Sequence, residues 1–212
     1  LPNSGDVNAS GIAYLNSNNI WEILAKKVIQ RSWFPSVYRP GFHTIRPDSN
    51  WFIDQWFPFD FSNQSIAGVG TDQPDLSNHR YGDWSEAPGD WSFYRPSYRN
   101  YQVKGECFRH TFRCLNVEAR LRVLNDDEIR KAFNRASNNE DTILAFTNHD
   151  FRDMVKETLP LIERISKIAR EFPDVNVITA DALSAAREVT KIKYSRPDLS
   201  CELLFISEKE VR

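Results

Sequence analysis

The second half of the sequence alternates between helical and strand-like segments, and this alternation constrains the fold more than any other feature. Helical spacing of apolar residues is found at 125–140, 151–172 and 181–192, and apolar strand-like runs lie between them at 141–150 and 174–180. Parallel strands joined by crossover helices produce this order, so we expect an α/β fold with a parallel sheet or barrel. In such folds, active sites lie at the carboxyl ends of the strands.

Further elements are expected on either side of this region. They are a helix at 19–31, a strand at 34–41 stopped by Pro-Gly, a helix at 47–57, two strand-like stretches at 105–112 and 115–124, and one more strand from residue 201. Asn125 and Glu128 have the spacing of a capping box at the start of the helix at 125–140. Pro160 is expected to kink the helix that contains it.

Composition excludes some classes of partner. The 212 residues, 41% of them hydrophobic, suit one domain with a proper core. The formal net charge of −2 gives no electrostatic reason to expect a nucleic acid or an anionic membrane. No apolar stretch approaches the ~20 residues that cross a bilayer, and the three cysteines form no metal motif. We therefore expect a soluble, cytoplasmic protein.

Residues 58–104 show no sustained periodicity, yet they are studded with Trp and Tyr. Because disordered segments are poor in aromatic residues, we expect a long ordered loop, and loops of this length are usually functional. Trp84, Trp91 and Tyr94 are candidates for packing against the apolar face of a sugar while nearby acids bind its hydroxyls. The alternative is that these rings form a minor aromatic core beneath the loop.

His149 and Asp150 follow the expected strand at 141–150, where a barrel opens. A histidine at a strand end can exchange a proton with a substrate near neutral pH, and Asp150 could bind that substrate. The alternatives are a histidine that is hydrogen-bonded at the start of a loop and an aspartate that caps the next helix.

Arg39 lies at the end of another expected strand, in the sequence YRPG. Its rigid fork of donors could bind a carboxylate or an oxyanion, although a surface arginine before a turn is the alternative. Asp60 is flanked by aromatic residues and therefore needs a hydrogen-bonded or charged partner, for which Arg39 is the natural candidate.

Four motifs taken in order resemble the later half of the polysaccharide deacetylase family, the chitooligosaccharide-deacetylase-like enzymes. They are PSVYRPG (35–41), PFDFS (58–62), ILAFTNHDF (143–151) and VNVITADALSAAR (175–187). The resemblance covers roughly residues 20 to 190. It implies a distorted (β/α) barrel that hydrolyses N- or O-acetyl groups of a carbohydrate with a divalent metal, zinc above all. It also implies that His149 is the general acid, that Arg39 orients a catalytic carboxylate, and that Asp60 holds Arg39.

The sequence departs from the family pattern ahead of Arg39. The family's Asp-Asp pair supplies the general base and one metal ligand, and its H-x-x-x-H motif supplies two more ligands; neither occurs in the 38 residues before Arg39. We therefore expect residues 1–195 to be the later part of a barrel that is incomplete at its N-terminus, and residues 196–212 to begin a further strand or a C-terminal extension. A missing segment or a second chain would complete the barrel, and the isolated chain would be inactive. The alternative is a non-catalytic glycan-binding or scaffolding domain on the same barrel.

Overall fold

A parallel β-sheet organises the chain. The computed structural model describes residues 18–31, 35–41, 45, 49–67, 82–118 and 122–192. Within these residues, four strands form one sheet: Val37–Tyr38 (β1), Phe59–Asn63 (β2), His110–Asn116 (β3) and Ala145–Thr147 (β4). The helices of this part of the chain are Asn18–Arg31 (α1), Ser49–Trp56 (α2), Asp126–Ser137 (α3), Met154–Ala169 (α4) and Ala182–Thr190 (α5).

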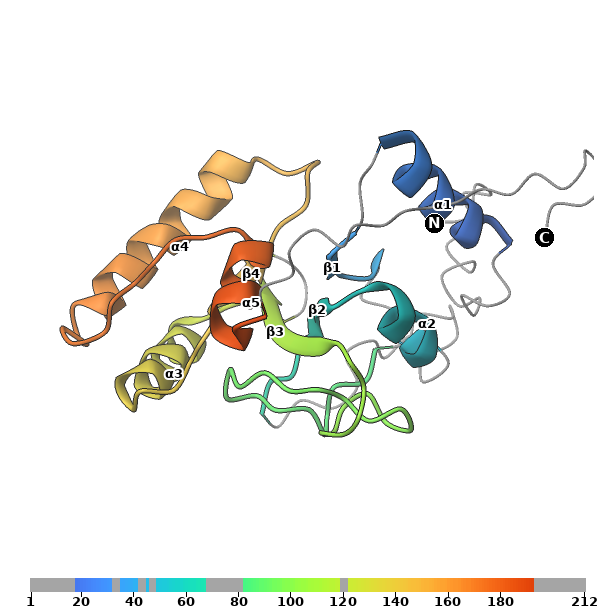
Figure 1. Ribbon diagram of the computed structural model, residues 1–212. Coiled ribbons are helices and arrows are strands. Elements are labelled where there is room, and N and C mark those ends of the chain that lie inside the picture. The colour runs from blue at the N-terminus through green and yellow to red at the C-terminus, as the bar shows by residue number, and fades with distance from the viewer. Residues whose placement is uncertain are drawn as a thin grey trace, which may run out of the picture.

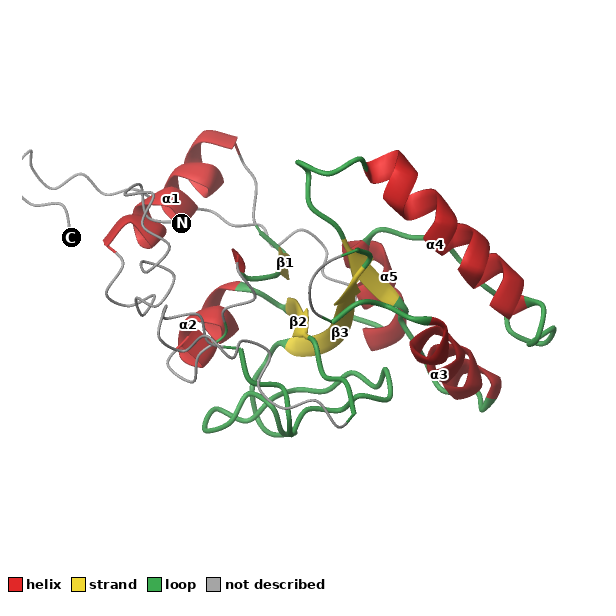
Figure 2. Cartoon of the chain, turned by 180° about the vertical axis from the view of Figure 1, so that it is seen from behind, coloured by secondary structure: helices red, strands yellow, loops and turns green. Residues whose placement is uncertain are grey.

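The strands lie side by side in the order of the chain, β1-β2-β3-β4, and each neighbouring pair is parallel. Because parallel neighbours need a crossover, a long connection joins each strand to the next, and two of these three connections contain described helices, α2 between β1 and β2 and α3 between β3 and β4. The sheet curls, with α1 and α2 beside β1 and β2, and with α3, α4 and α5 beside β3 and β4 (Figures 1 and 2). Helix α5 packs on one face of β3, and α3 and α4 pack on the other. The predicted α/β class is confirmed, and the curled sheet is compatible with part of an α/β barrel.

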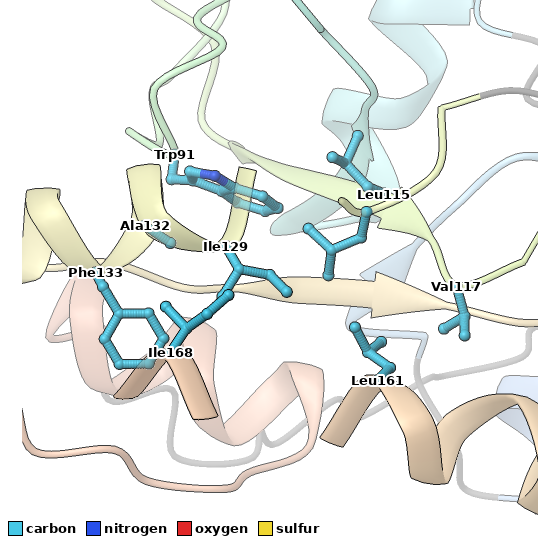
Figure 3. Close-up of a cluster of buried hydrophobic side chains, with 9 residues drawn as sticks. Trp91, Leu115, Val117, Ile129, Ala132, Phe133, Leu161 and Ile168 are labelled. Carbon is cyan, nitrogen blue, oxygen red and sulfur yellow. The ribbon is translucent and has the colours of Figure 1, made fainter. Parts of the chain in front are cut away.

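Strand β3 shows why helices are needed on both faces of the sheet, since successive side chains of a strand point to opposite faces. Phe112 and Cys114 pack with β2 residues and with Ala186 of α5. Leu115 points the other way, into a cluster formed with α3 and α4 (Figure 3). The buried members of that cluster are Trp91, Leu115, Val117, Leu124, Ile129, Ala132, Phe133, Leu161 and Ile168.

A third cluster joins the first helices to the segment before β3. Phe52 and Ile53 of α2 pack with Leu24 of α1 and with Trp84 and Tyr101. Residues 82–109 are therefore ordered by burial of their aromatic rings rather than by regular secondary structure, as expected for an ordered loop.

The helix ends follow local sequence signals. The side chain of Asn125 accepts a hydrogen bond from the backbone N–H of Glu128, so the predicted cap of α3 is confirmed. Asp153 caps α4 and Asp181 caps α5 in the same way. Helix α4 continues through Pro160.

Several predicted strands are shorter than expected or absent. The strand expected at 34–41 is reduced to the two residues of β1, and the two stretches at 105–112 and 115–124 yield the single strand β3. Strand β2 lies inside the segment expected to be a loop from residue 58. The strand expected at 174–180 does not form, and the side chains of Val177 and Ile178 in that segment are exposed. The expected strand from residue 201 lies outside the described residues.

No helix in the described ranges is both long enough and apolar enough to cross a membrane.

Candidate functional site

The guanidinium of Arg39 bridges β2 and β3 near their carboxyl ends. It follows β1 directly and is half-buried, and its Nη1 donates to the carbonyl oxygens of Phe61 (2.9 Å) and Cys114 (3.2 Å). Its Nη2 lies 3.3 Å from Oδ1 of Asn116, the last residue of β3. Because a guanidinium presents its donors in a fixed plane, these bonds hold the ends of β2 and β3 at a defined separation.

Asp60 is buried in β2, but its cationic partner is Arg109 rather than Arg39. Its Oδ2 lies 3.3 Å from Nε of Arg109, and its Oδ1 accepts hydrogen bonds from the backbone N–H and the hydroxyl of Ser62. Burial raises the pKa of the Asp60 carboxyl above its ordinary value, and the nearby positive charge of Arg109 offsets only part of this effect.

The strand register explains why the expected pair of Arg39 and Asp60 does not form. Tyr38 pairs with Asp60, so the side chains of these two residues point to the same face of the sheet. Arg39, one residue later, is aligned with Phe61 and turns toward the opposite face, where it reaches Asn116. The expectation that Asp60 holds Arg39 is therefore wrong.

Arg109 is the centre of a buried polar network that the sequence-based search missed. Besides Asp60, its Nη1 lies 3.5 Å from Oδ1 of Asp54, and its Nη2 donates to the side chain of Asn50. The sequence offers one signal for this network. Arg109 comes directly before a strand with alternating apolar residues, and an arginine that is buried there requires acidic partners. This network joins α2 to the amino ends of β2 and β3 and so stabilises the sheet.

His149 lies in the loop after β4 and is exposed. Its ring stacks on Phe151, with ring centroids 4.9 Å apart and planes inclined by 17°, and its backbone N–H donates to Oδ1 of Asn148 at 2.8 Å. Asp150 is also exposed, and it does not cap α4, because Asp153 does. The imidazole is accessible to a substrate at this edge of the sheet.

The strand register connects His149 to Arg39. Asn116, which accepts a hydrogen bond from Arg39, pairs with Thr147 at the end of β4, and His149 follows two residues later. Both predicted residues therefore lie at the carboxyl edge of one sheet, with β2 and β3 between them. The structure places these two residues at the same edge of the sheet, after its first and its last strand, and it places the side chain of Asp60 on the face opposite to Arg39.

The aromatic residues expected to bind a sugar are part of the core. Trp84, Trp91 and Tyr94 are only 1%, 2% and 3% exposed. The indole N–H of Trp91 donates to the carbonyl of Glu128 at 2.8 Å, and Trp84 packs edge-on against Tyr101. Because their faces are covered, they cannot stack on a ligand, and the alternative of an aromatic core beneath the loop describes them.

A second buried arginine links the loop to α3. Arg113 of β3 lies 2.5 Å from a carboxylate oxygen of Glu128 and donates to the carbonyl of Ser65 at 2.6 Å, and its guanidinium lies 4.4 Å from the centre of the Trp91 ring. Burial lowers the pKa of Arg113, and Glu128 partly offsets this. These contacts assign Arg113 to the interior rather than to a site.

The residues present do not fit the metal that the family resemblance implies. In the part of the chain that the structure describes, no three His, Cys, Asp or Glu side chains gather closely enough to hold an ion. The described residues therefore supply no step that depends on a metal.

Comparisons of the chain with models of protein families, with curated proteins and with solved structures found no significant match.

Proposed function

We propose that the carboxyl edge of this sheet is one part of a carbohydrate deacetylase site, in which His149 delivers a proton to the leaving group. The observation that supports this proposal is the placement of Arg39 and His149 at the same edge of one parallel sheet, after β1 and β4. Sites of α/β proteins lie at this edge.

The roles follow from the contacts of each residue. Hydrolysis of an acetyl group requires attack of water on the carbonyl carbon and protonation of the departing nitrogen or oxygen. His149 is exposed, and the described contact of its ring is with the apolar ring of Phe151, so its imidazole can meet a substrate and supply that proton. Arg39 is a positioning residue, because its donors hold Phe61, Cys114 and Asn116.

The rest of the site would come from residues outside the described ranges or from a second chain. Within the described residues, β4 is the last strand of the sheet, and Phe146 in its centre is 38% exposed. An open edge at β4 leaves backbone groups that a further strand can pair with. Apolar side chains are also exposed on α4 nearby, at Val155, Leu159 and Ile162.

The test is release of acetate from acetylated oligosaccharides. The protein should be expressed from the complete reading frame that encodes these residues, as the wild type and as His149→Ala, with Glu163→Gln on the exposed side of α4 as the matched control. We expect the wild type and the control to release acetate at equal rates, and His149→Ala to lose at least about 100-fold in kcat, the usual contribution of a general acid.

Absence of acetate release by the wild type, together with binding of the same oligosaccharides, would instead support the second function, a non-catalytic glycan-binding or scaffolding domain. If the wild type neither releases acetate nor binds the oligosaccharides, both functions are rejected.

A further inference from the structure

Three aromatic side chains reach solvent at the amino edge of the sheet, opposite to Arg39 and His149. Trp51 of α2 is 59% exposed and Phe108 is 74% exposed, and Tyr98 lies between the interior and the surface. The rings of Trp51 and Tyr98 are in contact, with centroids 5.6 Å apart and planes inclined by 48°. We call Trp51, Tyr98 and Phe108 the aromatic platform.

One buried carboxylate holds the platform in place. Oδ2 of Asp54 accepts hydrogen bonds from the Tyr98 hydroxyl at 2.9 Å and from the Phe108 backbone N–H at 3.2 Å. The side chain of Asp54 is only 4% exposed, and it also lies within 3.5 Å of the Arg109 guanidinium. Since Asp54 is fixed by α2 and by Arg109, the segments that carry Tyr98 and Phe108 are fixed relative to Trp51. A ligand therefore meets surfaces that are already ordered, which reduces the entropy lost on binding.

The platform is not part of the site at the carboxyl edge. Trp51 lies on the helix that leads into β2, and Phe108 lies two residues before β3 begins. Helix α2 and the loop drawn in green lie at the lower end of the sheet in Figure 1, while the connection from β4 to α4 lies at its upper end. The two edges can therefore bind different parts of a ligand, or different ligands.

We propose that the aromatic platform binds a pyranose ring of a glycan chain. The apolar C–H face of a pyranose packs on an aromatic ring, while its hydroxyls need hydrogen-bonding groups at the rim. Exposed Gln55, Arg99 and Glu106 are neighbours of the platform residues in the chain and supply such groups. The guanidinium of Arg95 lies 5.9 Å from the centre of the Phe108 ring; its Nε and Nη2 donate to the carbonyl oxygens of Cys107 and Glu106, and its Nη1 can donate to a sugar hydroxyl.

The size of the platform favours a sugar over a protein partner. The exposed parts of Trp51 and Phe108 amount to on the order of 300 Å², given the area that such rings contribute. A stable protein interface takes about 800 Å² from each partner. A sugar ring matches the extent of this exposed aromatic area.

The experiment is isothermal titration calorimetry of the 212-residue chain with two probes, the hexasaccharides of N-acetylglucosamine and of glucose. We expect saturable binding of at least one probe, and Trp51→Ala should weaken it at least tenfold, as expected for a central aromatic contact. Tyr98→Phe keeps the ring but loses the hydrogen bond to Asp54, so it should weaken binding by a smaller factor. Ile178→Ala, which removes an exposed apolar side chain from the segment between α4 and α5, is the matched control and should bind like the wild type.

Three results would overturn the proposal. One is no saturable binding of either hexasaccharide at millimolar concentration. Another is binding that survives Trp51→Ala but is lost in Phe151→Ala, which would place the sugar at the carboxyl edge. The third is self-association of the wild type that Trp51→Ala abolishes in sedimentation, without sugar binding, which would make the platform a protein interface. Because Trp51 and His149 lie at opposite edges of the sheet, loss of platform binding would leave kcat for acetate release unchanged.

Discussion

Replacement of Arg109 by Met should be among the most destabilising single changes in this chain. The Arg109 side chain is 1% exposed, and its guanidinium faces two carboxylates that are also nearly inaccessible, those of Asp54 and Asp60. At 3.3 Å, a pair of unit charges interacts with about 5 kcal/mol at an effective dielectric constant of about 20. Removing one partner of such a pair leaves a buried charge uncompensated and typically costs about 3–5 kcal/mol. We expect Arg109→Met to lower the free energy of unfolding by that amount at neutral pH.

A double-mutant cycle separates the charge effect from the loss of packing. Urea unfolding followed by circular dichroism would be measured for Arg109→Met, Asp60→Asn and the double variant. Asp60→Asn removes a buried charge, so Arg109→Met should lower the free energy of unfolding by less in that background than in the wild type. The coupling free energy between the two substitutions should be about 1–3 kcal/mol. Arg130→Ala is the matched control: its ion pair with Glu171 has a similar distance, 3.0 Å, but the two side chains are 40% and 44% exposed, and stability should barely change.

The destabilisation caused by Arg109→Met should depend on pH, because Asp60 loses its charge in acid. The folded-state pKa of Asp60 is raised by burial, so the folded state binds this proton more readily than the unfolded chain does. The charged form of Asp60 therefore costs stability above the folded pKa, and the cost disappears as pH falls below the unfolded value of about 4. Arg109→Met should be most destabilising at neutral pH and less so in acid. A cost below about 1 kcal/mol at neutral pH, or a cost that grows in acid, would refute this account of the network.

Three further changes test other parts of the structure. Asn125→Ala removes the cap of α3 and should cost about 1 kcal/mol in urea unfolding, whereas Asn125→Asp should cost much less; equal costs would contradict the capping role. Trp91→Ala should lower the free energy of unfolding by about 3–5 kcal/mol because the ring is buried; a loss as small as that of a surface substitution would contradict its placement in the core. The hydrogen bond to Asp54 raises the pKa of Tyr98 to about 12, so its stabilising effect is present below pH ~10 and is lost as pH rises toward 12. Ultraviolet titration should show one late-titrating phenol fewer in Tyr98→Phe than in the wild type, because burial raises the pKa of Tyr94 in both proteins.

Local signals in the sequence were sufficient for several elements. The cap at Asn125 and the apolar spacing of the following helix depend on residues within one or two turns, and both are present in the structure. The parallel pairing of β3 with β4 follows from the same kind of signal, because a helix expected between two strand-like stretches forms a crossover. The positions of Arg39 and His149 at the carboxyl edge were predictable for this reason.

Features that depend on contacts between distant segments were not predictable in this way. The partner of Asp60 depends on the register of β1 against β2, which decides the face to which Arg39 turns. The segment at 174–180 has the apolar composition of a strand, but strand formation also requires a neighbouring strand, and Ile178 remains exposed. Trp84 and Trp91 are buried by α2 and α3, which no property of the loop itself indicates.

The central claim is that His149 protonates the leaving group of an acetylated sugar. Its most direct test is the pH profile of kcat/KM for acetate release by the protein from the complete reading frame, compared between the wild type and His149→Ala. A general acid must be protonated to act, so the wild-type rate should fall as pH rises, while His149→Ala should be slow and should lack this alkaline limb. A His149→Ala variant with the rate and the pH profile of the wild type would contradict the claim.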